Sequence, residues 1–253
     1  MSSMDAYRGK VALITGGGKG IGYSIASGLS HHGMAVVLTG RSADALDKAK
    51  EDIVTRGGLV EVFPTDLSKY GNVLALKAFV LERFRTVDVL VNNAAGWLSG
   101  MLEDADVQEI DQIIDTTIKA PIWLCREFLP VLSKNAPSHI INITTLGVRP
   151  GRSNATPVYI AAKAGLAGFT ESLRRYAIKQ GVRVSEVLPG SVASEFPPVT
   201  APEKIIEKHG GSRYPAKDIA ETIEFILTRS EAAMVEDISL PAIGDWAEDW
   251  ARY

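Results

Sequence analysis

The chain has 253 residues, 46% hydrophobic and 23% charged, a balance that excludes a mainly disordered chain and allows one domain with a sizeable core. Its 27 basic and 30 acidic residues give a formal net charge of −3, so the sequence offers no basic field for binding nucleic acid. The single cysteine, Cys125, excludes an internal disulfide framework and a cysteine-ligated metal cluster.

Neither a metal site nor a membrane segment is expected. The four histidines include no pair spaced for a helix-borne zinc site. The first apolar run, Val11 to Ile14, is too short for the core of a signal peptide, and no segment approaches the roughly 18 apolar residues of a membrane span. We therefore expect a cytoplasmic protein whose partners are neither nucleic acid nor membranes.

Short β-branched runs alternate with longer amphipathic stretches along the chain. The runs predict seven strands, at residues 11–15, 35–39, 59–63, 87–91, 139–143, 182–187 and 238–240. The stretches between them predict helices that include residues 21–32, 43–55, 73–85, 104–132 and 158–179. This alternation is typical of a doubly wound α/β sandwich of three layers with a seven-stranded parallel sheet. We expect one domain over residues 1–253.

A segment rich in proline and glycine, Pro189 to Pro215, follows the sixth predicted strand. In an α/β fold a mobile substrate lid would lie at this place, here at about residues 191–215. A long surface excursion explains the same composition equally well.

Glycines cluster where the first predicted strand meets the first helix. Residues 15–22 read Thr-Gly-Gly-Gly-Lys-Gly-Ile-Gly. Glycines at such a turn let the backbone approach a pyrophosphate, whose charge the free N–H groups and the helix dipole stabilise. The spacing departs from Gly-x-Gly-x-x-Gly, since Ile21 takes the place of the third glycine, and a plain tight turn is the alternative.

Two further motifs carry polar chemistry. Residues 92–96, Asn-Asn-Ala-Ala-Gly, follow the fourth strand, where amide side chains can tie neighbouring strands together. Tyr159 and Lys163 are four residues apart on a predicted helix and therefore share one face. A nearby ammonium would favour the phenolate and lower the pKa of the tyrosine from near 10, as acid–base work requires. Taken singly, the first motif also fits a simple turn at the end of a strand. The second also fits an ordinary surface helix.

In this order and spacing the three motifs resemble the short-chain dehydrogenase/reductase family, over about Gly9 to Leu240. Asp66-Leu67, the run from Asn142 to Thr145, and Pro189-Gly190 match the family as well. The resemblance implies a Rossmann-like fold, a nicotinamide cofactor, a small-molecule carbonyl or alcohol substrate, and an assembly of two or four copies. The aromatic tail, residues 244–253, would lie at the interface between copies.

By resemblance, Tyr159 would be the general acid or base of a hydride transfer. Lys163 would bind the nicotinamide ribose and lower the tyrosine pKa, and the Thr145 hydroxyl would hold the substrate oxygen. The residues implied for the cofactor are Thr15, Gly16, Gly18, Lys19, Gly20, Ile21, Gly22, Arg41, Ser42, Asp66, Leu67, Asn93, Ala94, Ala95, Lys163, Pro189, Gly190, Val192 and Ser194.

Three positions depart from the family pattern. Thr145 stands where serine is usual, which keeps the hydroxyl but adds a methyl group, and Thr144 is the alternative. Thr117 stands where the family often has a catalytic asparagine that anchors a water, so the proton relay is in doubt. Ala95 replaces a common glycine, and Gly96 follows it.

The cofactor type is read from the end of the second strand. Arg41, helped by Lys19, would favour the 2′-phosphate of NADP(H) over NAD(H), which the site could also accept. A solvated arginine is the alternative. Trp97 is a candidate pocket wall, with ordinary core packing as the other interpretation. We expect an NADP(H)-dependent carbonyl reductase or alcohol dehydrogenase. The alternatives are an enoyl reductase and a cofactor-binding sensor with little turnover.

Overall fold

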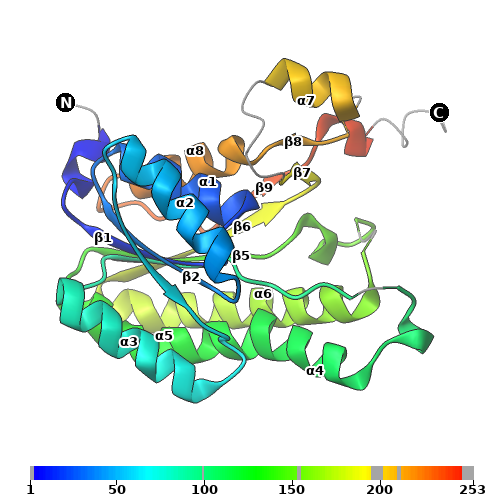
Figure 1. Cartoon of the computed structure of the whole chain (residues 1–253), viewed down its shortest axis with the longest axis horizontal. Coiled ribbons are helices and arrows are strands. Elements are labelled where there is room, and N and C mark those ends of the chain that lie inside the picture. The colour runs from blue at the N-terminus through cyan, green and yellow to red at the C-terminus, as the bar shows by residue number, and fades with distance from the viewer. Residues whose placement is uncertain (1–2, 99, 153–154, 195–201, 210–211, 247–253) are drawn as a thin grey trace.

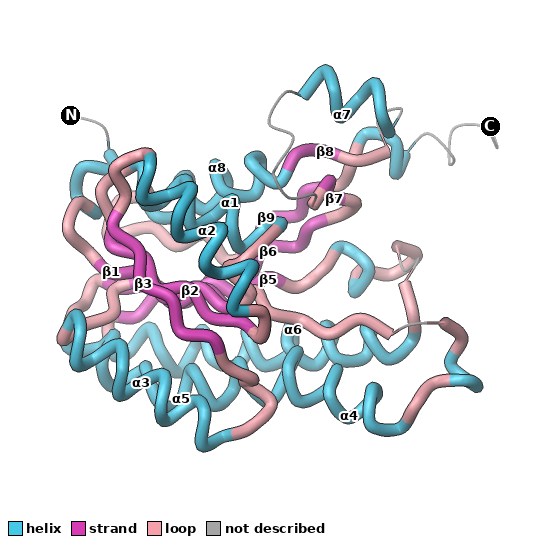
Figure 2. The backbone as a smooth tube through the Cα atoms, in the orientation of Figure 1, coloured by secondary structure: helices cyan, strands magenta, loops and turns pink. Residues whose placement is uncertain are grey.

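The computed structural model describes residues 3–98, 100–152, 155–194, 202–209 and 212–246. A parallel sheet of seven strands lies between two layers of helices (Figures 1 and 2). The order across the sheet is β3-β2-β1-β4-β5-β6-β9. The strands are β1 (Val11–Thr15), β2 (Ala35–Gly40), β3 (Leu59–Pro64), β4 (Val89–Asn92), β5 (Ser138–Ile143), β6 (Val182–Pro189) and β9 (Asp237–Leu240). The predicted fold class is confirmed, and each predicted strand is present with both ends within two residues.

The helices divide between the two faces of the sheet. One face carries α1 (Gly20–His31), α2 (Ala43–Thr55) and α8 (Ala216–Leu227), while the other carries α3 (Tyr70–Phe84), α5 (Ala120–Lys134) and α6 (Pro157–Ala177) (Figure 1). All five residues of β1 are buried, as a strand covered on both faces requires. The sheet therefore has an apolar core on each side.

The predicted helix over residues 104–132 is wrong in one respect. It is divided into α4 (Val107–Ile114), a π-helical segment (Asp115–Lys119) and α5. The apolar periodicity of the sequence runs through this segment, but the backbone there adds a wider turn with i→i+5 hydrogen bonds.

The proline-rich segment after β6 is only partly described. It holds the two-residue strands β7 (Val192–Ala193) and β8 (Tyr214–Pro215), which pair in parallel, and the helix α7 (Pro202–His209). Residues 195–201 and 210–211 of the expected lid lie outside the described residues, as do residues 247–253 of the expected interface tail. Short 3-10 helices complete the chain, at Ser3–Tyr7, Leu102–Asp104, Leu146–Val148, Ile178–Gln180 and Ile243–Trp246.

The winding of the chain changes direction at the centre of the sheet. From β1 the chain moves outward through β2 to β3, then returns to pair β4 with the other side of β1. The crevice beyond the carboxyl ends of the strands at such a switch point is where ligands bind in open α/β sheets.

Candidate active site

A cavity of about 990 Å³ opens at this crevice, near the upper end of the range of about 300–1,000 Å³ for ligand pockets. Most of the residues implied for the cofactor and for catalysis line it. They are Gly16, Gly18, Lys19, Gly20, Ile21, Arg41, Ser42, Asp66, Leu67, Asn93, Ala94, Ala95, Thr145, Tyr159, Lys163, Pro189, Gly190, Val192 and Ser194. Thr15, Gly22 and Thr117 do not line it.

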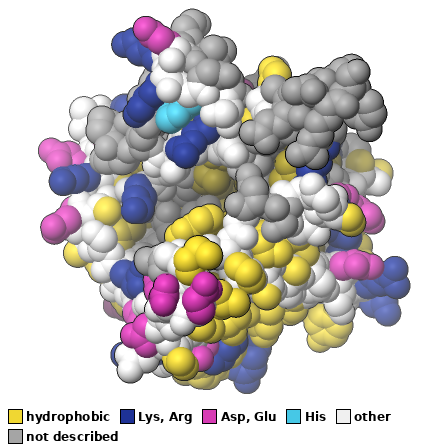
Figure 3. Space-filling model, turned by 90° about the vertical axis from the view of Figure 1, so that its right-hand side faces the viewer, with side chains coloured by type: hydrophobic (Ala, Val, Ile, Leu, Met, Phe, Trp, Pro, Cys, Tyr) yellow, Lys and Arg dark blue, Asp and Glu magenta, His cyan; other side chains and the backbone are white. Residues whose placement is uncertain are grey.

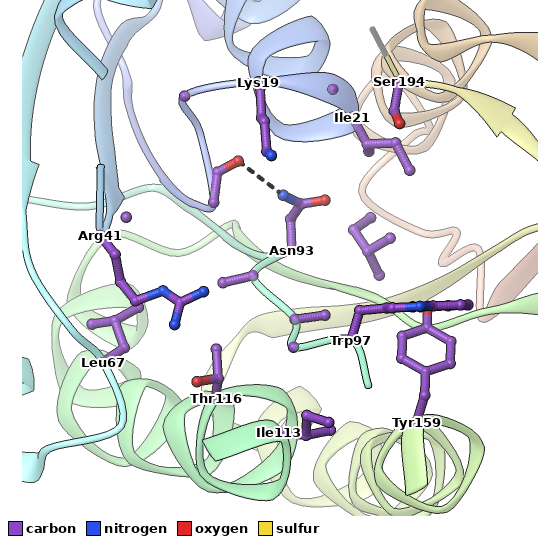
Figure 4. A pocket seen from close by; sticks show the side chains of 18 of the residues that line it. Lys19, Ile21, Arg41, Leu67, Asn93, Trp97, Ile113, Thr116, Tyr159 and Ser194 are labelled. Carbon is purple, nitrogen blue, oxygen red and sulfur yellow. Dashed lines mark hydrogen bonds between the residues drawn. The ribbon is translucent and has the colours of Figure 1, made fainter. Parts of the chain in front are cut away.

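Thr15 lies behind the cavity wall and joins the ends of β1 and β4. Its hydroxyl accepts hydrogen bonds from the backbone N–H groups of Asn93 (2.9 Å) and Ala94 (3.0 Å). The Asn93 amide in turn donates to the carbonyl oxygens of Thr15 (2.9 Å) and Gly16 (3.3 Å; Figure 4). These bonds hold the glycine turn against the segment after β4, so the two motifs form one wall.

Gly22 lies in the first turn of α1, where that helix packs on the glycine turn. A Cβ atom at this position would be 2.2 Å from the carbonyl oxygen of Gly16 and 2.6 Å from Nδ2 of Asn93. Real Cβ atoms do not approach other heavy atoms so closely. Gly22 thus supports the cavity from behind, by letting the helix begin directly beneath the turn.

The end of β5 and the start of α6 bring Thr145, Tyr159 and Lys163 to the same end of the cavity. Pro157 is at the start of α6, where its missing N–H costs no helical hydrogen bond. The Lys163 ammonium donates to the carbonyl oxygen of Ile143 (2.5 Å) and lies 5.8 Å from the centre of the Tyr159 ring. The hydroxyl of Thr145 lies 3.5 Å from the carbonyl oxygen of Pro189.

The pKa of Tyr159 differs from the expectation. The sequence predicts that Lys163 lowers it, whereas burial raises the pKa of the phenol above its ordinary value of 10.0. A hydrogen bond with the Thr145 hydroxyl acts in the opposite direction and does not outweigh burial. Burial lowers the pKa of Lys163 to about 8. The Lys163 ammonium is hydrogen-bonded to the Ile143 carbonyl and does not lower the pKa of Tyr159. Without a ligand, Tyr159 is therefore protonated near neutral pH.

Thr117 is fully buried in the π-helical segment. Its hydroxyl accepts a hydrogen bond from the backbone N–H of Gly96 (3.1 Å). The residue that stands in the place of the family asparagine therefore fixes the segment after β4. Its neighbour Thr116 lines the cavity instead.

Two basic side chains point into the cavity near the glycine turn. Figure 4 shows Lys19 directed toward Asn93 and the Arg41 guanidinium directed across the pocket beside Leu67. Both residues are exposed, so their charges would meet a ligand that enters from solvent. Asp66, after β3, also lines this end.

Trp97 lies at the opposite end, over Tyr159 (Figure 4). The two ring centroids are 4.9 Å apart and the rings are tilted by 53°. The indole is 59% exposed, so Trp97 is a pocket wall rather than a core residue. Met101 and Leu102, on the same connection between β4 and α4, are also exposed, as is Val107, the first residue of α4. Hydrophobic side chains gather on this end of the molecule (Figure 3).

Further lining residues were not identified from the sequence. Glu109, Gln112 and Ile113 on α4 line the cavity. Gln112 and Ile113 follow Glu109 by three and four residues, which places both on the same helix face as Glu109. Their spacing was visible in the sequence, but it does not say what the helix face meets.

Within the described ranges, no helix combines the length and apolarity that a membrane crossing requires. Over the same ranges, no three side chains of histidine, cysteine, aspartate or glutamate gather where they could bind a metal.

Comparison with known proteins identifies the family. Residues 10–203 match the family described as short chain dehydrogenase. An uncharacterized oxidoreductase of Staphylococcus epidermidis is 31% identical over 238 residues, which cover 94% of this chain and 99% of that protein.

Solved structures of similar proteins support the same family. A metagenomic short-chain oxidoreductase in complex with NADP has 32% identity and a TM-score of 0.79, over 94% of this chain and 100% of that one. An alcohol dehydrogenase from the archaeon Thermococcus sibiricus, complexed with 5-hydroxy-NADP, has 27% identity and a TM-score of 0.80, over 92% and 97% of the two chains. The sequence match and the shared fold show that this chain belongs to the short-chain dehydrogenase family.

Proposed function

We propose that the chain is an NADP(H)-dependent oxidoreductase that transfers a hydride between the nicotinamide and a small carbonyl or alcohol substrate. Tyr159 is the general acid or base, assisted by Thr145 and Lys163. One observation carries this proposal: the three side chains line one end of the cavity whose other end is the glycine turn. A binding protein without turnover would not need this tyrosine.

The residues of the cavity fit a dinucleotide. Gly16, Gly18 and Gly20 line it without side chains, so a pyrophosphate can approach the backbone N–H groups at the start of α1. Asp66 and Leu67 line the wall that would hold the adenine, and Pro189 and Gly190 line the cavity together with the proposed catalytic residues. When bound, the nicotinamide supplies or accepts the hydride.

Tyr159 supplies the proton in the direction of reduction. Because burial raises its pKa, the phenol is protonated near neutral pH and can donate to a carbonyl oxygen. The Thr145 hydroxyl, which shares a hydrogen bond with the phenol, is positioned to hold that same oxygen. In the direction of oxidation Tyr159 must lose its proton, and an ammonium on the same helix face is the group that would stabilise the phenolate electrostatically, which is the role proposed for Lys163.

The preference for NADP(H) is supported by Arg41 and Lys19. A guanidinium forms strong paired hydrogen bonds with a phosphate, and no acidic residue is present between Leu38 and Ala43 to bind a ribose 2′-hydroxyl. The complexes of the two related structures with NADP and with 5-hydroxy-NADP agree with this preference.

The test is NADPH oxidation, with NADH in parallel, against a panel of ketones, diketones, quinones and acyl-thioester ketones. Wild type is compared with Tyr159→Phe and with Tyr176→Phe, a control on the same helix whose ring is 64% exposed. We expect turnover of at least one carbonyl by wild type and the control, and a loss of at least about a hundredfold in Tyr159→Phe.

The outcomes separate enzyme from sensor. Turnover that survives in Tyr159→Phe would contradict the assigned role of the phenol. Tight binding of NADPH without turnover of any compound on the panel would instead favour a cofactor-binding sensor. Reduction of a carbon–carbon double bond conjugated to the carbonyl would favour an enoyl reductase.

A further inference from the structure

The sheet contains a buried carboxylate that the proposed mechanism does not use. Glu186 lies in β6, every residue of which is buried, and it is 7% exposed. A carboxylate inside a protein is costly unless hydrogen bonds and an opposite charge balance it. Its surroundings therefore indicate what it does.

Glu186 and Lys163 form hydrogen bonds with two consecutive residues at the end of β5. The Thr144 hydroxyl donates to Oε1 of Glu186 (2.6 Å). The Lys163 ammonium donates to the carbonyl oxygen of Ile143, the residue before Thr144 (2.5 Å). The carboxylate from β6 and the ammonium from α6 thus converge on the end of β5, where Thr144 and Lys163 both line the cavity.

We propose that Glu186 is the buried counter-charge of Lys163, a positioning residue that keeps the ammonium charged at the catalytic end of the cavity. This inference deepens the proposed function, on which its kinetic readout rests. The carboxylate itself lies outside the cavity lining, so it acts through the lysine.

The electrostatics support this assignment. Lys163 is 2% exposed, and burial lowers its pKa to about 8, while the negative charge of Glu186 acts in the opposite direction. Among the described residues, Glu186 is the charged group whose electrostatic effect opposes the lowering of the Lys163 pKa by burial. The other charged or titratable residues along the cavity are Lys19, Arg41, Asp66, Glu109 and Tyr159.

Other charges near Glu186 have partners of their own. The Arg174 guanidinium on α6 donates to the carbonyl oxygens of Val184 (3.2 Å) and Glu236 (2.7 Å). Asp237, opposite Glu186 in β9, forms an ion pair with Arg149. The Glu236 side chain is 64% exposed, so solvent screens its charge.

The variant that isolates the charge is Glu186→Gln. Its amide oxygen can still accept from Thr144, so the hydrogen bond is kept while the negative charge is removed. With the counter-charge gone, we expect the pKa of Lys163 to fall by about one unit. Glu236→Gln is the matched control, because it makes the same change in net charge at an exposed position.

The experiment is an NMR titration of protein labelled with ¹³C at lysine Cε, with the Lys163 signal assigned from Lys163→Met. The expected midpoint is near pH 8 in wild type and in the control, and about one unit lower in Glu186→Gln. A folded Glu186→Gln protein whose midpoint stays within about 0.3 unit of wild type overturns the proposal. Because this readout needs no turnover, it decides the inference even if the proposed reaction is absent.

The kinetic readout follows the same logic. Where carbonyl reduction is found, the alkaline limb of the kcat/KM profile moves to lower pH in Glu186→Gln but not in Glu236→Gln. An alkaline limb that does not move while the NMR midpoint does would overturn the part of the proposal that links Glu186 to catalysis.

If Glu186→Gln does not fold, the double variant with Lys163→Met decides. Lys163→Met alone leaves a buried carboxylate without its counter-charge, which is strongly destabilising. A charge pair predicts that adding Glu186→Gln raises the unfolding midpoint above that of Lys163→Met. An equal or lower midpoint in the double variant overturns the proposal.

Discussion

Substitution of Gly22 tests the way in which α1 packs against the glycine turn. In Gly22→Ala the new Cβ would lie 2.2 Å from the Gly16 carbonyl oxygen and 2.6 Å from the Asn93 amide nitrogen. Both atoms are held in place, the amide by hydrogen bonds to Thr15 and Gly16. Overpacking against fixed atoms costs about 3 kcal/mol, and one weakened hydrogen bond costs about 1 kcal/mol more.

The helix propensity of alanine offsets about 1 kcal/mol of that cost, so the free energy of unfolding should fall by about 3 kcal/mol. The matched control is Gly168→Ala in α6, where a new Cβ meets nothing within 4 Å and the residue is exposed. There only the propensity acts, so stability should rise by up to about 1 kcal/mol.

The assay is equilibrium unfolding in urea, followed by far-ultraviolet circular dichroism, for wild type and both variants. NADPH affinity is measured alongside, because displacement of Asn93 also distorts the cavity wall. A Gly22→Ala protein as stable as wild type would refute the packing argument. Loss of stability in Gly168→Ala would refute the use of propensity as the offsetting effect.

Two further predictions follow from other residues. Arg41→Ala should raise the dissociation constant of NADPH by about tenfold to a hundredfold, because a charge-assisted bond to the 2′-phosphate is lost. Fluorescence titration should show an NADH change below about twofold, and equal weakening of both cofactors would contradict the assignment. His139 is buried and its pKa is lowered to about 3. The unfolded chain binds that proton near pH 6.5, so wild-type stability should fall by about 1.4 kcal/mol per pH unit as pH decreases from 6.5 toward 3. His139→Gln should lack this component in acid-dependent urea unfolding, and an unchanged pH dependence would contradict it.

The strands were predictable because burial on both faces leaves a strong compositional signal. Val11 to Thr15 reads as a continuous apolar and β-branched run, and the structure buries every residue of it. The division of the predicted helix at Asp115 was not predictable in this way. Its apolar spacing continues through residues 115–119, and the change of hydrogen bonding depends on where α4 and α5 each pack.

Residues of the site were predictable where a motif carries chemistry in its side-chain type and spacing. Tyr159 and Lys163 share one helix face because they are four residues apart, and both line the cavity. Their pKa values depend on burial, which no local pattern contains. Glu186 was overlooked for the same reason, since a single acid in a strand is a signal only once its neighbours are known.

The position of Thr117 shows the limit of motif comparison. The sequence placed it where a water-anchoring side chain would be, but its hydroxyl accepts from the Gly96 backbone. Which partner a threonine takes depends on the path of a segment 21 residues away in the chain. Only the folded arrangement supplies that information.

The π-helical segment separates two helices that serve different cores. One residue beyond a regular turn rotates the following helix by about 100°, since 3.6 residues make a full turn. Ile113 of α4 belongs to a small apolar cluster with Leu98 and Ala162, whereas Leu124 and Phe128 of α5 belong to the core beneath the sheet. The π-helical segment thus changes the rotation of α5 about the helix axis relative to α4. As a result α4 turns Ile113 toward the small cluster near the cavity, while α5 turns Leu124 and Phe128 toward the core beneath the sheet.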